Sequence, residues 1–180
     1  MSKTTQVRQQ TFTAPKAAEN DDVHAAITLP ASGTTVVTTA ITNPDVPRVV
    51  RIKGNAAGIT GNVVVVGTDI QGNSITDTIV AVDDTAVDGV KAFATVTSIT
   101  VPARTQSGDT ISVGLGAALG LDCFCDAYSF TGFAGVSSYA HDASDISKNV
   151  ATPSATLDGS TNQALTYVPA IFPKYSRIWG

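Results

Sequence analysis

The feature that most constrains the fold is the segment 61–82, GNVVVVGTDIQGNSITDTIVAV, in which four consecutive valines stand among Thr, Gly and Asn residues. The valines at 63–66 are branched at Cβ and stiff at χ1, so they favour a pleated strand over a helix. A second arm over residues 74–80 follows residues 68–73, whose Gly and Asx residues tolerate the positive φ that a turn needs. The segment therefore predicts a β-hairpin.

Further short strands are predicted on both sides of this hairpin, separated by Gly, Asn, Asp and Pro. They cover residues 34–41, 46–53, 90–101 and 110–113. In the second of them Val50 and Ile52 alternate with Arg51 and Lys53, which indicates one buried and one wet face. A spacing of roughly 10 residues between strands is typical of an all-β fold, an antiparallel β-sandwich or barrel. We expect this β-sandwich core to cover residues 33–122.

The two ends of the chain lack this alternation. Residues 1–32 have no sustained period of 2 or 3.6, which predicts an extended N-terminal arm. Residues 123–180 are expected to form a C-terminal extension that can complete the sandwich, with a short helix within residues 137–149 and an aromatic tail. Aromatic anchors pack either on the chain's own core or on another subunit. The expected interface residues are Phe12, Pro15, Tyr167, Phe172, Tyr175 and Trp179.

The charge content limits the partners. Charged residues make up 14% of the chain and the net charge is -4, so the basic footprint of a nucleic-acid-binding protein is missing. An ordinary domain carries about 25% charged residues. A surface of Thr, Ser and Gly is covered by neighbouring proteins at little desolvation cost. We therefore expect protein partners, including further copies of the chain, and no nucleic acid.

The sequence has no stretch of about 18 apolar residues for a membrane span, and residues 1–22 lack the apolar run of a secretory signal. We expect a protein made and kept in a cytoplasm, with no membrane contact. Cys123 and Cys125 are expected to be free buried thiols, because a reducing cytoplasm disfavours disulfides and two cysteines are too few to hold zinc. A zinc site would need His24 or His141 in addition.

Two motifs resemble sites of catalysis or cofactor binding, and each has a simpler interpretation. Residues 137–145 contain Ser, His and Asp but no G-x-S-x-G elbow, so His141 and Asp142 are expected to make loop hydrogen bonds or to cap a helix. The glycines of residues 114–120 have the wrong spacing for a dinucleotide loop. We expect them to allow close backbone approach or a bulge.

Acidic residues gather in the loops at Asp69, 83–84 and Asp88, where they could hold a calcium ion. None of these loops has the alternating ligand spacing of a calcium loop. The sequence therefore predicts a protein that is not an enzyme, with no cofactor and no metal site.

Four motifs of residues 48–114 carry a resemblance. They are a G-N-V-x-V-x-G-T-D-x-x-G hairpin, an I-T-D-T-I strand, a K-A-F-x-T-V-x-S-I-T-V-P strand and a final G-D-T-I-S-V-G. Together they resemble a β-sandwich module of tailed-bacteriophage virion proteins. The resemblance implies a head decoration (cement) protein, or a neck or tail structural component, without catalytic residues.

The expected function is that of a structural component of the virion, made in the host bacterial cytoplasm, which decorates the head and stabilises the lattice of the major capsid protein. A collar or connector ring protein at the head-tail neck is the alternative. A carbohydrate-binding adhesin module is an alternative of another class. The aromatic content of 6% argues against the adhesin, because few rings are present to stack on a sugar, and the one tryptophan is Trp179.

Overall fold

The computed structural model describes residues 8–124, 135–142 and 144–167. These residues form antiparallel strands and one 3-10 turn, so the protein is all-β, as the alternation predicts. The strands are β1 (Arg8–Phe12), β2 (Glu19–Thr28), β3 (Thr35–Val37), β4 (Arg48–Gly54), β5 (Thr60–Thr68), β6 (Ser74–Val82), β7 (Val87–Phe93), β8 (Thr95–Val101), β9 (Thr110–Gly120), β10 (Val136–Ala140), β11 (Val150–Pro153) and β12 (Gln163–Tyr167). The 3-10 turn, η1, covers Ile146–Lys148.

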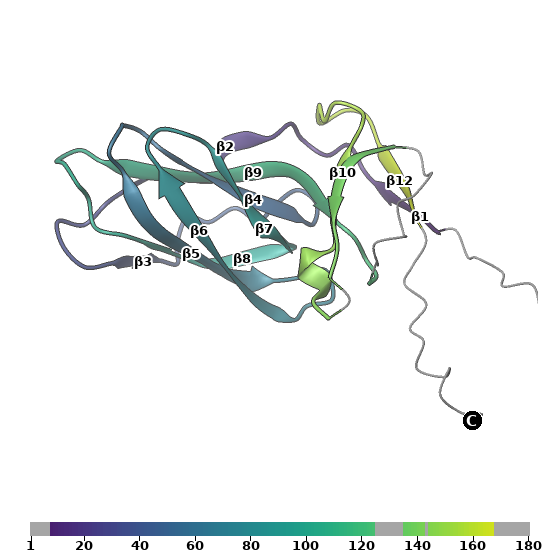
Figure 1. Cartoon of the computed structure of the whole chain (residues 1–180), viewed down its shortest axis with the longest axis horizontal. Helices are drawn as coiled ribbons and strands as arrows, with labels where there is room; N and C mark the ends of the chain where they lie inside the picture. Colours follow the sequence, from purple (N-terminus) through teal and green to yellow (C-terminus); the bar gives the residue numbers. More distant parts are fainter. Residues whose placement is uncertain (1–7, 125–134, 143, 168–180) are drawn as a thin grey trace, which may run out of the picture.

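Two sheets face each other in an elongated sandwich (Figure 1). The larger sheet has the order β10-β11-β9-β4-β7, and β2 also pairs with β9. The smaller sheet has the order β3-β8-β5-β6. The main core lies between them and contains buried Val, Ile, Leu and Phe side chains from both sheets. Burial of this apolar surface is the main force that holds the two layers together.

The predicted hairpin is confirmed as β5 and β6, which pair from Thr60↔Val82 to Thr68↔Ser74 without a break. Val63 and Val65 are fully buried, whereas Val64 and Val66 are half-buried. The run of valines thus alternates between the core and the outside, as a pleated strand requires. In the connecting turn Gly72 has a φ of +83°, a value that a residue without Cβ adopts readily.

The segment 90–101, predicted as one strand, is two strands in different sheets. β7 pairs with β4 in the larger sheet, and β8 pairs with β5 and β3 in the smaller one. Ala94 stands at the crossing, where its amide donates to the carbonyl of Thr68 at 2.8 Å. Phe93, Ile99 and Val101 share one parity in this segment, and all three are fully buried. Alternation of apolar and polar residues predicts which side chains are buried, but it does not predict which sheet a strand joins. The break between β7 and β8 was therefore not predicted.

β9 is longer than the predicted strand at 110–113, because the glycines that follow it continue the strand. A Cβ on Gly114 would lie 2.0 Å from the carbonyl oxygen of Glu19, and one on Gly116 would lie 2.4 Å from a methyl of Val49. The glycines therefore allow strands to approach closely, as expected from the sequence. The predicted strand at 34–41 is instead shorter, with Thr35–Val37 paired to β8.

The N-terminal arm predicted over residues 1–32 is extended, but its described part is paired within the chain. β1 pairs with β12, from Arg8↔Tyr167 to Phe12↔Gln163, and β2 pairs with β9. These pairings were not predicted from the sequence. The register of β2 shifts twice along β9, and these irregularities hide the period of 2 in its sequence.

The C-terminal extension completes the larger sheet with β10 and β11. The helix predicted within residues 137–149 is not formed, because residues 136–140 pair with β11 and only Ile146–Lys148 is helical. Asp145 caps this turn by accepting from the amide of Ser147. Short Asp and Ser side chains that bond to nearby amides compete with a continuous helix, which accounts for the interruption.

Candidate interaction surfaces

The outer side of the smaller sheet is a surface without charge. Alternation turns one set of its side chains outward, and cross-strand pairs align them: Thr100 lies opposite both Val36 and Val64, and Val64 opposite Thr78. We call this surface the neutral face; its residues are Val36, Asn62, Val64, Val66, Thr76, Thr78, Val80, Ser98 and Thr100. All are exposed or half-buried.

Within β3, β5, β6 and β8, all of which the structure describes, Asp77 is the one charged residue. Its side chain points inward and is 5% exposed. One carboxylate oxygen accepts from the amides of Val90 at 2.8 Å and Lys91 at 3.0 Å on β7, and the other accepts from the amide of Thr78. Asp77 therefore connects the edge of one sheet to the edge of the other and leaves the neutral face uncharged.

The larger sheet differs, because its strands carry most of the charges of the sandwich. β2 contributes Glu19, Asp21 and Asp22, and on β4 and β7 Arg51 donates to both carboxylate oxygens of Asp88. A copy of this protein, with its net charge of -4, meets carboxylates on this side and none on the neutral face. The two sides of the sandwich thus suit different partners.

A second candidate surface is the end of the sandwich where β1 and β12 lie (Figure 1). Because Arg8 and Tyr167 are register partners, residues 1–7 and 168–180 are attached to the body at one place. Two of the predicted interface residues contribute to the body itself. Phe12 is 4% exposed and belongs to a small core with Leu119 and Leu165, and Pro15 is buried. Both are therefore buried within their own chain, and their role at an interface with another subunit stays a prediction.

The other predicted interface residues belong to the segment that follows this pairing. Tyr167 is the last residue of β12, and Phe172, Tyr175 and Trp179 lie outside the described residues. Residues 168–180 also carry Lys174 and Arg177 and no acidic residue, so the segment is both aromatic and basic. Aromatic and Arg side chains are the commonest anchors of protein interfaces.

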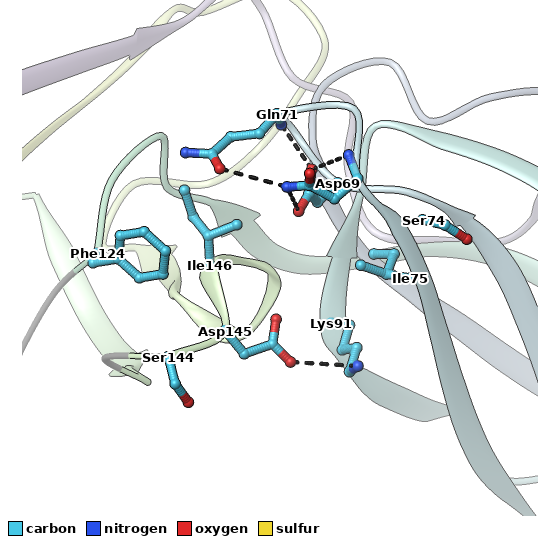
Figure 2. Close-up of a pocket in the computed structure, with 10 residues that line it drawn as sticks. Asp69, Gln71, Ser74, Ile75, Lys91, Phe124, Ser144, Asp145 and Ile146 are labelled. Carbon is cyan, nitrogen blue, oxygen red and sulfur yellow. Dashed lines mark hydrogen bonds and ion pairs between the residues drawn. The ribbon is translucent and has the colours of Figure 1, made fainter.

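A pocket of about 270 Å³ lies between the hairpin turn and η1 (Figure 2). Across it the Lys91 ammonium pairs with the Asp145 carboxylate at 3.4 Å. Partial burial raises the pKa of Asp145, but hydrogen bonds from Ser147 and the charge of Lys91 outweigh it, so this pKa lies below its ordinary value. The pair binds the C-terminal extension to β7. The lining residues are Asp69, Gln71, Asn73, Ser74, Ile75, Lys91, Phe124, Ser144, Asp145 and Ile146.

The carboxylates considered for calcium serve as hydrogen-bond acceptors and ion-pair partners. Asp69, which is 3% exposed, accepts from the amides of Gln71 and Asn73 and so fixes the hairpin turn. Asp83 accepts from the amide of Gly58, and Asp88 pairs with Arg51. Among the described residues no cluster of three or more His, Cys, Asp or Glu side chains is arranged to hold a metal ion.

His141 and Asp142 lie in the loop before η1. Asp142 accepts from the hydroxyl and the amide of Ser144, and these bonds hold the pKa of Asp142 well below its usual range. The predicted role of Asp142 in loop hydrogen bonding is confirmed, and the His141 ring lies 6.1 Å from that of Tyr139. Cys123 is half-buried against the small core of Phe12, and Cys125 lies outside the described residues.

Sequence reasoning missed the neutral face and the two polar links to β7. The face could have been found from the hairpin alone, since positions 62, 64 and 66 and positions 76, 78 and 80 have the outward parity and carry no charge. The links from Asp77 and Asp145 to β7 had no such signal, because they join residues of different sheets and of the C-terminal extension.

Comparison with known proteins adds no relative: no family model, curated protein or solved structure matches the chain. The class of the protein is defined by its fold alone, an all-β sandwich with a C-terminal extension. In the described part of the chain, no helix has both the length and the apolar character to cross a membrane.

Proposed function

We propose that this protein is a structural subunit of a tailed-bacteriophage virion, a head decoration protein that binds the lattice of the major capsid protein. The resemblance of residues 48–114 to virion β-sandwich modules supports this proposal. In the folded chain these residues form β4 to β8 and the start of β9, so the resembling region supplies most of the smaller sheet and a part of the larger one.

The observation that carries the proposal is the pairing of Arg8 with Tyr167. The sequence that follows Tyr167 contains Phe172, Tyr175 and Trp179, together with two basic side chains. A segment of this kind gains burial when it lies on a capsid protein, and a repeated lattice multiplies a modest affinity into durable attachment.

The test is binding of purified protein to particles assembled without it, measured as copies bound per particle. We expect the triple substitution Phe172→Ala, Tyr175→Ala and Trp179→Ala to reduce the apparent affinity by about 100-fold or more, because each aromatic anchor contributes about 1–2 kcal/mol. Ser176→Ala, in the same segment, is the matched control and leaves binding unchanged.

Three outcomes of this test count against the proposal. Wild-type protein that fails to bind particles contradicts the virion assignment. Equal binding by the triple variant and the control contradicts the anchoring role of the segment. A copy number of about a dozen per particle, instead of hundreds, places the subunit in a ring at the neck and contradicts head decoration.

A further inference from the structure

We infer that the neutral face is the contact between two copies of this chain, packed sheet to sheet about a twofold axis. The inference goes beyond the virion proposal and does not depend on it. It starts from the residues of β3, β5, β6 and β8, whose outward side chains are Val, Thr, Ser and Asn.

Charge favours a second copy as the occupant. Each copy has a net charge of -4, and at physiological salt like charges repel over about 8 Å. The larger sheet presents Glu19, Asp21 and Asp22 as well as Arg51 and Lys53, so contact through it would bury charges of both signs. The neutral face presents none, and the Asp77 carboxylate behind it is turned inward and bonded to three amides. Apposition of two neutral faces therefore buries no charge and meets no like charge.

The size and shape of the face also suit a pair of copies. With strands about 4.8 Å apart and residues about 3.3 Å apart, the 3, 7, 9 and 9 residues of β3, β8, β5 and β6 make a flat footprint of roughly 440 Å². That footprint is about half of the 800 Å² per partner that a stable interface buries, so the contact is expected to be weak and reversible. Val and Thr are short and stiff at χ1, so they lose little rotamer freedom when they interdigitate across sheets packed about 10 Å apart. A twofold axis lets each copy use the same surface.

Association through the strand edge is disfavoured by the fold. β6 is the long edge strand of the smaller sheet, and an exposed edge of this length could pair with another chain. Its inward carboxylate at Asp77 binds two β7 amides instead, which holds β7 against that side of β6. An inward-pointing charge is a common protection of an edge strand. The edge of β6 is therefore less available to a second copy than the broad face beside it.

The test is sedimentation velocity of the full chain over a concentration series up to about 200 µM, where an interface of this modest size is expected to have a Kd on the order of 10 µM. The double substitution Thr76→Lys/Thr78→Lys places two charges on the neutral face from exposed positions of β6. We expect it to raise the Kd by at least about 30-fold, because four ammonium groups would meet across the axis.

The matched control is Ala26→Lys/Thr28→Lys, which changes the charge equally at two exposed positions, also two residues apart, on β2 of the larger sheet. It is expected to leave the Kd within about 3-fold of wild type. Circular dichroism verifies that both variants are folded. Wild-type protein that stays monomeric throughout the series overturns the inference, and so does an equal loss of dimer in both double variants.

The same variants separate this inference from the proposed function. The aromatic variant at Phe172, Tyr175 and Trp179 is expected to lose particle binding and to keep the dimer. Loss of dimer in that variant overturns the assignment of the dimer contact to the neutral face. A Thr76→Lys/Thr78→Lys variant that still forms dimers but no longer binds particles assigns the face to the capsid lattice and overturns the inference, while the virion proposal stands.

Discussion

Replacement of Asp77 by Ala tests the link between the two sheets. Asp77 is 5% exposed, so water cannot readily take its place, and its Oδ2 atom accepts from the amides of Val90 and Lys91. A hydrogen bond to a charged group contributes about 1.5–3 kcal/mol, so the loss of two bonds gives about 3–6 kcal/mol. We expect a loss near the lower limit, about 3 kcal/mol, because the two amides share one carboxylate oxygen.

The assay is equilibrium unfolding in urea. With an m value of about 2 kcal/mol/M, a loss of about 3 kcal/mol lowers the midpoint by about 1.5 M. Asp77→Asn keeps one acceptor oxygen and is expected to lose about half as much, because the remaining bond has no charge assistance. Hydrogen exchange of the Val90 and Lys91 amides gives a local readout, and we expect both to exchange faster in Asp77→Ala.

The matched control for this prediction is Asp84→Ala, since Asp84 is exposed on the turn between β6 and β7. A surface substitution of this kind changes stability by about 0.5 kcal/mol or less. If Asp77→Ala unfolds at the same urea concentration as Asp84→Ala, with unchanged exchange at the two β7 amides, the link does not stabilise the sandwich and the reasoning is refuted.

Three further predictions concern other parts of the fold. Gly67→Ala is expected to destabilise by more than about 2 kcal/mol in urea unfolding, since its Cβ would lie 1.9 Å from the carbonyl oxygen of Thr95, and a smaller effect would contradict this close approach. Arg48 is fully buried and donates to the Gly116 carbonyl, so Arg48→Met is expected to lower the free energy of unfolding by about 3 kcal/mol. A thermal midpoint equal to that of wild type would contradict this prediction. Amides of its own loop lower the pKa of Asp158 to about 2, which a carboxyl NMR titration can check. This folded pKa lies below the unfolded value near 4, so the carboxylate stabilises its loop above about pH 4 and loses that effect as the pH falls through about 2. Titration of Asp158 at its ordinary value near pH 4 would refute the prediction.

The parts of the fold that follow from local chemistry were predictable. The hairpin of β5 and β6 depends on β-branched residues, a tight turn and alternation, all contained within residues 60–82. The inward positions of Phe93, Ile99 and Val101 follow from the same period of 2. The glycines after Val113 were likewise interpreted correctly as sites of close approach, because no side chain fits there.

The candidate surfaces were predictable only in part. The low charge of the chain indicated a surface suited to protein contact, but it did not locate the neutral face. The burial of Phe12 and Pro15 could not be foreseen, because the small core that covers Phe12 is assembled from strands far apart in the chain. An apolar residue in a polar segment has the same appearance in a sequence whether it packs within the chain or on a partner.

The sequence by itself determined that the chain forms strands and which side of each main strand is buried, since both depend on neighbouring residues. Only the tertiary structure decided the partners of those strands. The pairing of β1 with β12, the passage from β7 to β8 between sheets and the attachment of η1 through Asp145 all join distant residues. Such contacts are selected by the energy of the whole packed sandwich, and the same local alternation is compatible with several of them.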